Sequence, residues 1–278
     1  MRVLLLTAGA LVGFAANSLL TRAALGTAQI DAASFTLVRL LSGAVVLTLL
    51  ARVRPRASTE GGSWTSALAL AGYAIFFTLA YRRIGAGVGA LVLFGTVQIT
   101  MIGTGLVRGE RPAPIDWAGL ALALAGLLAL TLPGASAPDA MGICLMAVAG
   151  IGWGAYSLAG RTSRDPLGAT AGNFVRATAG GALFVAASVP GLHATPGGLG
   201  LAAASGSVAS GVGYALWYAV LPAIPAWRAS VVQLTVPVLT ALVAGVLLDE
   251  AITVRLAVAT VLVAAGVWLT VAPALHRG

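Results

Sequence analysis

Apolar stretches of about twenty residues follow one another along almost the whole chain, separated by short gaps that hold most of the charge. A helix of about 20 apolar residues crosses the ~30 Å hydrocarbon core of a bilayer. Hydrophobic residues make up 59% of the 278 residues and charged residues only 9%, too few to give a soluble domain a polar surface. The sequence therefore predicts an all-α polytopic membrane protein.

We expect ten transmembrane helices, because breaker residues such as Arg54-Pro55, Pro133-Gly134 and Asp165-Pro166 separate the apolar runs. The first run continues to Leu20 without a polar break, so it is interpreted as a membrane span and not as a signal peptide. The expected helices cover residues 3–21, 32–51, 63–82, 84–107, 115–132, 140–160, 168–189, 198–221, 227–248 and 252–272.

The second half of the chain repeats the first at an offset of 140 residues. Residues 105–110 overlie residues 245–250, each segment beginning with Gly and ending with Glu, and Gly126 overlies Gly266. We divide the chain into two five-helix repeats, residues 1–135 and 139–278. Because five is odd, the repeats cross the membrane in opposite directions. Inverted repeats of this kind are typical of secondary transporters, whose substrate site lies between the repeats near the bilayer midplane.

Arginine placement predicts the orientation of the chain. All sixteen basic residues are arginines, and ten of them fall in segments on the side of the N-terminus, against four on the other side. The positive-inside rule then places both termini in the cytoplasm. The net charge of +8 thus reports orientation, and we expect no nucleic-acid partner.

The order of these motifs resembles a known family. The residues that carry the resemblance are Trp153-Gly154, Arg39, Arg176 and the two Gly-to-Glu segments, whereas Gly13-Phe14 stands where a Trp-Gly step is typical. Over nearly its whole length the chain resembles the EamA-type transporters of the drug/metabolite transporter superfamily, and within it the YddG-like amino-acid exporters. The resemblance implies export of amino acids or other small metabolites across the bacterial inner (plasma) membrane. It also implies a central cavity lined by the first, third, fourth, sixth, eighth and ninth helices.

Polar and aromatic residues within these helices are the candidate substrate contacts. Amides both donate and accept hydrogen bonds, which suits a zwitterion, although they can equally tie helices together. Aromatic rings can form an apolar pocket, although Tyr and Trp also anchor helices at the bilayer interface, as expected for Tyr81. The candidates are Asn17, Tyr73, Gln98, Trp153, Tyr156, Tyr214, Trp217 and Gln233.

A second set of residues is assigned structural or gating roles. Arg39 and Arg176 lie within spans and are interpreted as packing between helices, with binding of a substrate carboxylate as the alternative. Glu110 and Glu250 are expected to hold loops or arginines at helix ends. Proline removes a backbone hydrogen bond, and small residues permit close helix approach, so Pro237, Gly89 and Gly213 are candidate hinge positions.

Several functions are disfavoured by what the sequence lacks. No acidic residue stands in the middle of a span, so transport is expected to be facilitative or coupled without a buried carboxylate. The chain has no lysine and only two histidines, at a loop and at the C-terminus, so we expect no enzyme, no metal and no cofactor. The expected partners are a small-molecule substrate and the lipid bilayer, and the chain could act as a monomer. Nucleotide-sugar or purine-type metabolites remain alternative substrates, and a non-transport membrane protein or a membrane enzyme is the alternative from another class.

Overall fold

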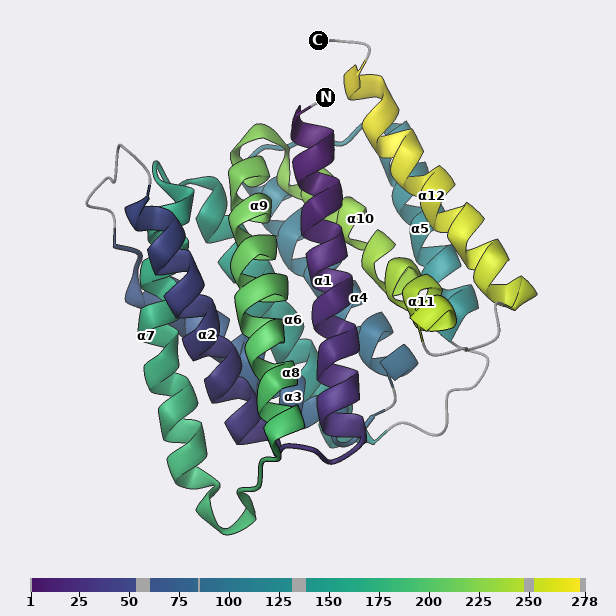
Figure 1. Ribbon diagram of the computed structural model, residues 1–278. Coiled ribbons are helices and arrows are strands. Elements are labelled where there is room, and N and C mark those ends of the chain that lie inside the picture. Colours follow the sequence, from purple (N-terminus) through teal and green to yellow (C-terminus); the bar gives the residue numbers. More distant parts are fainter. Residues whose placement is uncertain (1, 54–60, 85, 132–138, 248–252, 276–278) are drawn as a thin grey trace.

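The computed structural model is built from helices throughout the residues that it describes, which are 2–53, 61–84, 86–131, 139–247 and 253–275 (Figure 1). Two very short 3-10 turns, η1 (Val189–Gly191) and η3 (Leu221–Ala223), and one π-helical segment, η2 (Ser205–Val212), interrupt the α-helices. The α-helices are α1 (Arg2–Gly26), α2 (Ala32–Arg52), α3 (Trp64–Tyr81), α4 (Ala86–Val107), α5 (Pro114–Thr131), α6 (Ala140–Arg161), α7 (Pro166–Ala187), α8 (Pro196–Ala204), α9 (Gly213–Val220), α10 (Ala226–Gln233), α11 (Thr235–Leu247) and α12 (Val254–Leu275).

These helices form ten candidate spans, because α8, η2 and α9 form one and α10 with α11 another. Within the described residues, nine stretches are both long and apolar enough to cross a membrane. The tenth, α7, has the length with 22 residues but is less apolar because it contains Asn173 and Arg176. The expectation of an all-α membrane protein with ten helices in two repeats is confirmed.

Short polar residues begin several helices as expected from the sequence. The Asp165 side chain accepts a hydrogen bond from the Gly168 amide and is followed by proline at the first helical position of α7. Thr195 and Pro196 start α8 in the same way. N-terminal amides have no partner inside their own helix, so an oxygen at this position satisfies one of them.

Three of the expected helices differ from the structure. The first was predicted to end at residue 21 but continues to Gly26, because Ala24 is fully buried in a small cluster with Ile30, Phe35 and Ala202. The expected helix 227–248 is broken at Leu234, between α10 and α11. The cause is Pro237, which cannot donate to the carbonyl of Gln233 four residues earlier and whose ring crowds it. The π-helical segment within the expected helix 198–221 was not foreseen.

The packing pairs each helix of one repeat with helices of the other. Helix α5 lies beside α12, and α2 lies beside α7 (Figure 1). Helix α3 contacts α6, and the equivalent segment of the second repeat, η2 with α9, contacts α1. In the same way α4 contacts α6, and its equivalent α11 contacts α1. This reciprocal pairing is what two inverted copies related by a two-fold axis produce.

Glycines allow the closest of these contacts. A Cβ atom added at Gly119 of α5 would lie 2.6 Å from the Gly266 carbonyl oxygen of α12. At Gly126 it would lie 2.9 Å from side-chain atoms of Leu262 and Val263. The glycines that mark the repeat in the sequence therefore lie in the interface between the last helices of the two repeats, where small residues are needed for backbone approach.

Candidate functional site

A cavity of about 200 Å³ lies between the two repeats. Its walls come from α1, α3, α4, α6, α9 and the α10–α11 pair, which are the helices implied by the family resemblance, with the end of α5 added. The lining residues are Phe14, Asn17, Ser18, Arg22, Tyr73, Phe77, Tyr81, Ala90, Leu93, Phe94, Leu130, Thr131, Trp153, Tyr214, Gln233, Val236, Pro237, Thr240 and Ala241.

The cavity is displaced toward one face of the molecule. Arg22, Tyr81 and Thr131 belong to the last turns of α1, α3 and α5, which end on that face. Ala90 comes from the beginning of α4, which runs in the opposite direction. The opposite face, where α4 and α6 end and α10 begins, contributes none of the lining residues given above.

Aromatic rings form the inner wall of the cavity. The Phe14 ring packs edge-on against Trp153 with a centroid separation of 5.2 Å and against Tyr214 at 5.7 Å. Trp153 is 5.2 Å from Tyr73 and 5.0 Å from Tyr214. Such offset and edge-to-face contacts are favourable beyond simple burial. Four helices thus bring their rings to one place and give the cavity an apolar wall.

Two predicted amides lie at this wall. Gln233 accepts a hydrogen bond from the Trp153 indole nitrogen at 2.5 Å, and its own nitrogen donates to the Ala229 carbonyl at 3.2 Å. The break between α10 and α11 places Gln233 at the end of a helix facing the cavity. Asn17 accepts from the Ser205 hydroxyl at 2.7 Å through its carbonyl oxygen. Both side chains therefore combine helix–helix contact with a position at the cavity wall.

Three other predicted contacts are not among the lining residues. Gln98 donates to the Ser230 carbonyl at 2.8 Å and joins α4 to α10, so it does not face the cavity together with Gln233. Trp217 lies behind Phe14, with ring centroids 5.6 Å apart. Tyr156 lies behind Trp153, and its carbonyl accepts from the Tyr218 hydroxyl at 2.9 Å. The structure makes these residues a second layer behind the wall.

Part of the cavity lining was not predicted from the sequence. Phe77 and Tyr81 continue the line of Tyr73 along α3, at steps of four residues that place all three on one helix face. Tyr81 was expected to anchor the bilayer interface, whereas it lines the cavity and packs against Phe77 at 4.6 Å. The aromatic spacing on α3 was the available signal. Phe14 and Arg22 similarly fall on the Ser18 face of α1.

The two arginines that correspond in the repeats have different surroundings. Arg39 is 2% exposed, and its guanidinium donates to the hydroxyls of Ser210 and Tyr214, each at 3.1 Å. Its guanidinium carbon also lies 5.5 Å from the centre of the Tyr73 ring. Arg176 instead donates to the carbonyl of Gly61, just before α3, and to that of Gly172 in its own helix α7. Only Arg39 lies directly behind residues of the cavity wall.

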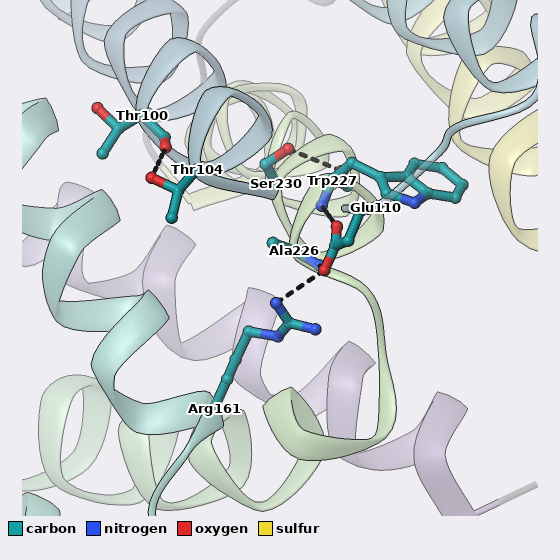
Figure 2. A network of polar contacts seen from close by, with 7 residues as sticks. All are labelled: Thr100, Thr104, Glu110, Arg161, Ala226, Trp227 and Ser230. Atoms are coloured by element: carbon teal, nitrogen blue, oxygen red, sulfur yellow. Dashed lines mark hydrogen bonds and ion pairs between the residues drawn. The ribbon is translucent and has the colours of Figure 1, made fainter. Parts of the chain in front are cut away.

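Glu110 ties three segments together on the face opposite the cavity (Figure 2). Its carboxylate accepts from the Arg161 guanidinium at 3.0 Å and from the backbone amides of Ala226 at 3.0 Å and Trp227 at 3.4 Å. Figure 2 shows it between the end of α6 and the start of α10. A carboxylate there accepts hydrogen bonds from amides that have no partner inside α10. It is also stabilised by the positive N-terminal end of the helix dipole. We call this arrangement the Glu110 latch.

Gly105 explains part of the Gly-to-Glu motif. A Cβ at Gly105 would lie 2.6 Å from a carboxylate oxygen of Glu110. The glycine therefore leaves the room into which the acid folds back. Glu250, the corresponding acid of the second repeat, lies outside the described residues.

The candidate hinge residues also have distinct environments. Gly213 of α9 crosses α1 at Gly13, where a Cβ on Gly213 would lie 3.4 Å from the Gly13 Cα. A Cβ on Gly89 would meet the flexible end of Met146 at 3.1 Å. Pro237 lines the cavity beside the break between α10 and α11.

Fold and site together define a two-repeat membrane protein with a cavity between its repeats. The family model for the EamA-like transporter family matches residues 1–132 and again residues 140–272. The chain therefore belongs to the EamA-like transporter family, and it is a multi-pass membrane transporter of the type found in the drug/metabolite transporter superfamily.

Two further comparisons give proteins similar to this chain. The chain is 50% identical over 277 residues to Uncharacterized protein PA1977 of Pseudomonas aeruginosa, covering 99% of this chain and 96% of that protein. A solved crystal structure of a protein aligns with a TM-score of 0.85 at 21% identity, covering 98% of both chains. At that identity the likeness shows the fold.

Proposed function

We propose that the protein is a secondary transporter that exports amino acids, among them aromatic or other neutral ones, by alternating access. The family supplies the transporter class. The observation that carries the substrate proposal is the cavity wall, in which rings suited to an apolar side chain stand beside the polar groups of Asn17 and Gln233. No acidic side chain is among the lining residues within the described parts of the chain, so the wall does not favour cationic drugs.

The size of the cavity favours small substrates. Pockets for drug-sized ligands have volumes of about 300–1,000 Å³, whereas this one has about 200 Å³. A free amino acid is smaller than a nucleotide-sugar, which would not fit without a large rearrangement. Purine-type metabolites, whose rings could stack on Trp153, are the second candidate class.

The proposed orientation gives each face a role. With the N-terminus in the cytoplasm of a bacterial cell, the cavity opens away from the cytoplasm and the Glu110 latch closes the cytoplasmic face. The structure then corresponds to an outward-facing state of an inner-membrane exporter. Export requires the Glu110 latch to open so that substrate enters from the inside. Nothing in this cycle requires covalent chemistry.

The test is uptake by the purified protein in proteoliposomes. Neutral amino acids, adenine and guanine, nucleotide-sugars and drug cations are each offered as labelled solutes, with protein-free liposomes as the control. The proposal expects saturable flux of at least one neutral amino acid. Flux confined to purines would support the second class, and flux confined to cations or nucleotide-sugars would contradict both.

A further inference from the structure

Arg39 is a buried cation whose charge is incompletely compensated. Burying a charge is costly unless it is paired and fully hydrogen-bonded. In the described part of the chain the ion pairs join Arg83 to Asp139 and Arg161 to Glu110, and no carboxylate pairs with Arg39. Its contacts are two neutral hydroxyls and a tyrosine ring, and its Nη1 atom has no hydrogen-bond partner among the described residues.

The position of this cation relates it to the cavity. Tyr73 and Tyr214, which contact the guanidinium from α3 and α9, both line the cavity. A hydroxyl can accept and donate at once, so Tyr214 can accept from Arg39 and donate its own proton to a ligand. No acidic residue is among the described lining residues, so no carboxylate of the described wall opposes an anionic group.

The π-helical segment η2 holds this arrangement together. It supplies Ser210, which accepts from Arg39, and Ser205, which donates to Asn17 of the cavity. Gly206 of the same segment packs so closely on the Arg39 carbonyl that a Cβ there has no room. π-Helical turns are rare and are frequently found at functional sites. The irregular helix thus fixes the position of Arg39 relative to the cavity.

We propose that Arg39 and the Tyr214 hydroxyl form the anion-binding end of the cavity and recognise a carboxylate on the transported molecule. The planar guanidinium matches the geometry of a carboxylate and forms short, charge-assisted hydrogen bonds with it. An amino acid would direct its carboxylate toward Arg39 and its side chain against Phe14 and Trp153. The inference deepens the proposed function and rests on it for the identity of the substrate.

Arg176 provides a matched control. It is the counterpart of Arg39 in the second repeat, but its guanidinium binds backbone carbonyls of Gly61 and Gly172 and lies 5.7 Å from the centre of the Trp64 ring. Neither arginine is itself among the cavity-lining residues, but only Arg39 of the two is shown in contact with lining residues, Tyr73 and Tyr214. Substitution of either arginine by glutamine removes one charge from a transmembrane helix, and only Arg39→Gln removes it from directly behind the cavity wall.

The first measurement is thermal stabilisation of the purified protein by benzoate and by benzylamine, which share a ring and differ in charge. We expect benzoate to stabilise the wild-type protein and the Arg176→Gln variant, and benzylamine to have little effect on either. Arg39→Gln and Tyr214→Phe should weaken the response to benzoate by about 10- to 100-fold in apparent affinity, the range expected for loss of a charge-assisted hydrogen bond. Tyr214→Phe keeps the ring, so it tests the site even if Arg39→Gln fails to fold.

The outcome is decided by the contrast between variants. Equal benzoate responses in wild type, Arg39→Gln and Tyr214→Phe would overturn the inference, as would a wild-type protein that does not respond to benzoate.

Amino-acid uptake into proteoliposomes separates this inference from the proposed function. An anion response that depends on Arg39, without any amino-acid flux, would reject the amino-acid substrate and keep the anion site. The converse outcome is that the Arg39→Gln and Tyr214→Phe variants still transport amino acids and still select carboxylates over the corresponding amines. That result would reject the anion site and keep the proposed function.

Discussion

At the scale of single residues, the two buried glutamines of α4 and α10 do different work although both are amides on lining helices. Gln233 orients the Trp153 indole through a 2.5 Å hydrogen bond and faces the cavity. Gln98 joins two helices through the Ser230 carbonyl and does not line the cavity. Truncation of either leaves a buried polar partner unsatisfied, which costs about 1–3 kcal/mol. The two truncations should differ in whether they weaken substrate binding.

We therefore expect Gln233→Ala and Gln98→Ala to separate transport from stability. Gln233→Ala should raise the KM for the transported solute by about tenfold, because Trp153 loses the partner that fixes its ring and each tenfold corresponds to about 1.4 kcal/mol. Gln98→Ala should lower the free energy of unfolding by a similar amount, seen as a lower Tm, while leaving KM near the wild-type value. Initial rates in proteoliposomes and unfolding in detergent measure the two effects. A larger rise in KM for Gln98→Ala than for Gln233→Ala would contradict the assignment.

At the scale of helices, close crossings limit where the repeats can move. Helices α1 and α9 cross at Gly13 and Gly213 without side chains between them. The break between α10 and α11 at Leu234 is a second candidate pivot next to the cavity, since Pro237 removes a backbone hydrogen bond there. A change of shape around the cavity would therefore use the α1–α9 crossing as a pivot.

The crossing predicts an effect for a bulky residue at Gly213. Gly213→Leu would wedge α9 away from α1, and overpacking of this kind costs about 1–3 kcal/mol. Transport should fall strongly while the protein still inserts into the membrane. Gly95→Leu on α4 is the matched control, because a Cβ at Gly95 meets nothing within 4 Å. Flux assays on equal amounts of folded protein compare the two, and wild-type flux for Gly213→Leu would exclude the pivot.

At the scale of the whole molecule, contacts between the repeats differ on the two faces. The Glu110 latch joins the end of the first repeat to Arg161 and α10 of the second. On the face of the cavity, Asp31 accepts a hydrogen bond from the His193 amide at 3.0 Å, and Ile30 forms an isolated antiparallel bridge with Ala194. Alternating access requires contacts of this kind to break and re-form on opposite faces.

The Glu110 latch predicts coupling between its two charged residues. Arg161 and Glu110 are each 19% exposed, so solvent partly screens their attraction. A double-mutant cycle with Glu110→Gln and Arg161→Gln should give a coupling energy of about 1 kcal/mol in unfolding. Glu110→Gln should also make α10 more accessible to exchange with solvent deuterium. Additive effects of the two substitutions would show that the ion pair does not hold the latch.

The contact at Asp31 predicts a pH effect on stability. Burial pushes the pKa of the Asp31 carboxyl upward, but hydrogen bonds from Ser34, His193 and Ala33 outweigh it and hold the pKa below its ordinary value of 3.8. Because the folded-state pKa lies below the unfolded one, this stabilisation is present above about pH 4 and is lost as the pH falls through the folded-state pKa.

Two substitutions at Asp31 test this pH effect. Asp31→Asn keeps an oxygen that can cap α2 and removes the titration, so the Tm difference from wild type should shrink as the pH falls below about 4. Asp31→Ala should lose about 1 kcal/mol more at neutral pH, because it also lacks the cap. A Tm difference between wild type and Asp31→Asn that does not change with pH would refute the assignment.

The sequence by itself determined the class of protein, the ten spans, the doubled motif and the family. These properties depend on composition and on spacing along the chain, which a sequence displays directly. The glycines Gly126 and Gly266, noticed as repeat markers, indeed lie at a helix interface between the repeats. The break at Leu234 was only partly foreseen, since Pro237 indicated a distortion but not two separate helices.

Only the tertiary structure decided which side chains meet at the cavity. The membrane helices are apolar around most of their circumference, so the sequence does not fix how each one is rotated about its axis. That rotation placed Gln233 at the cavity and Gln98 behind it, and it brought Tyr81 to the cavity wall. It also gave Arg39 and Arg176, equivalent in the repeat, different partners. Packing between the repeats thus decided the site, because residues distant in sequence form it together.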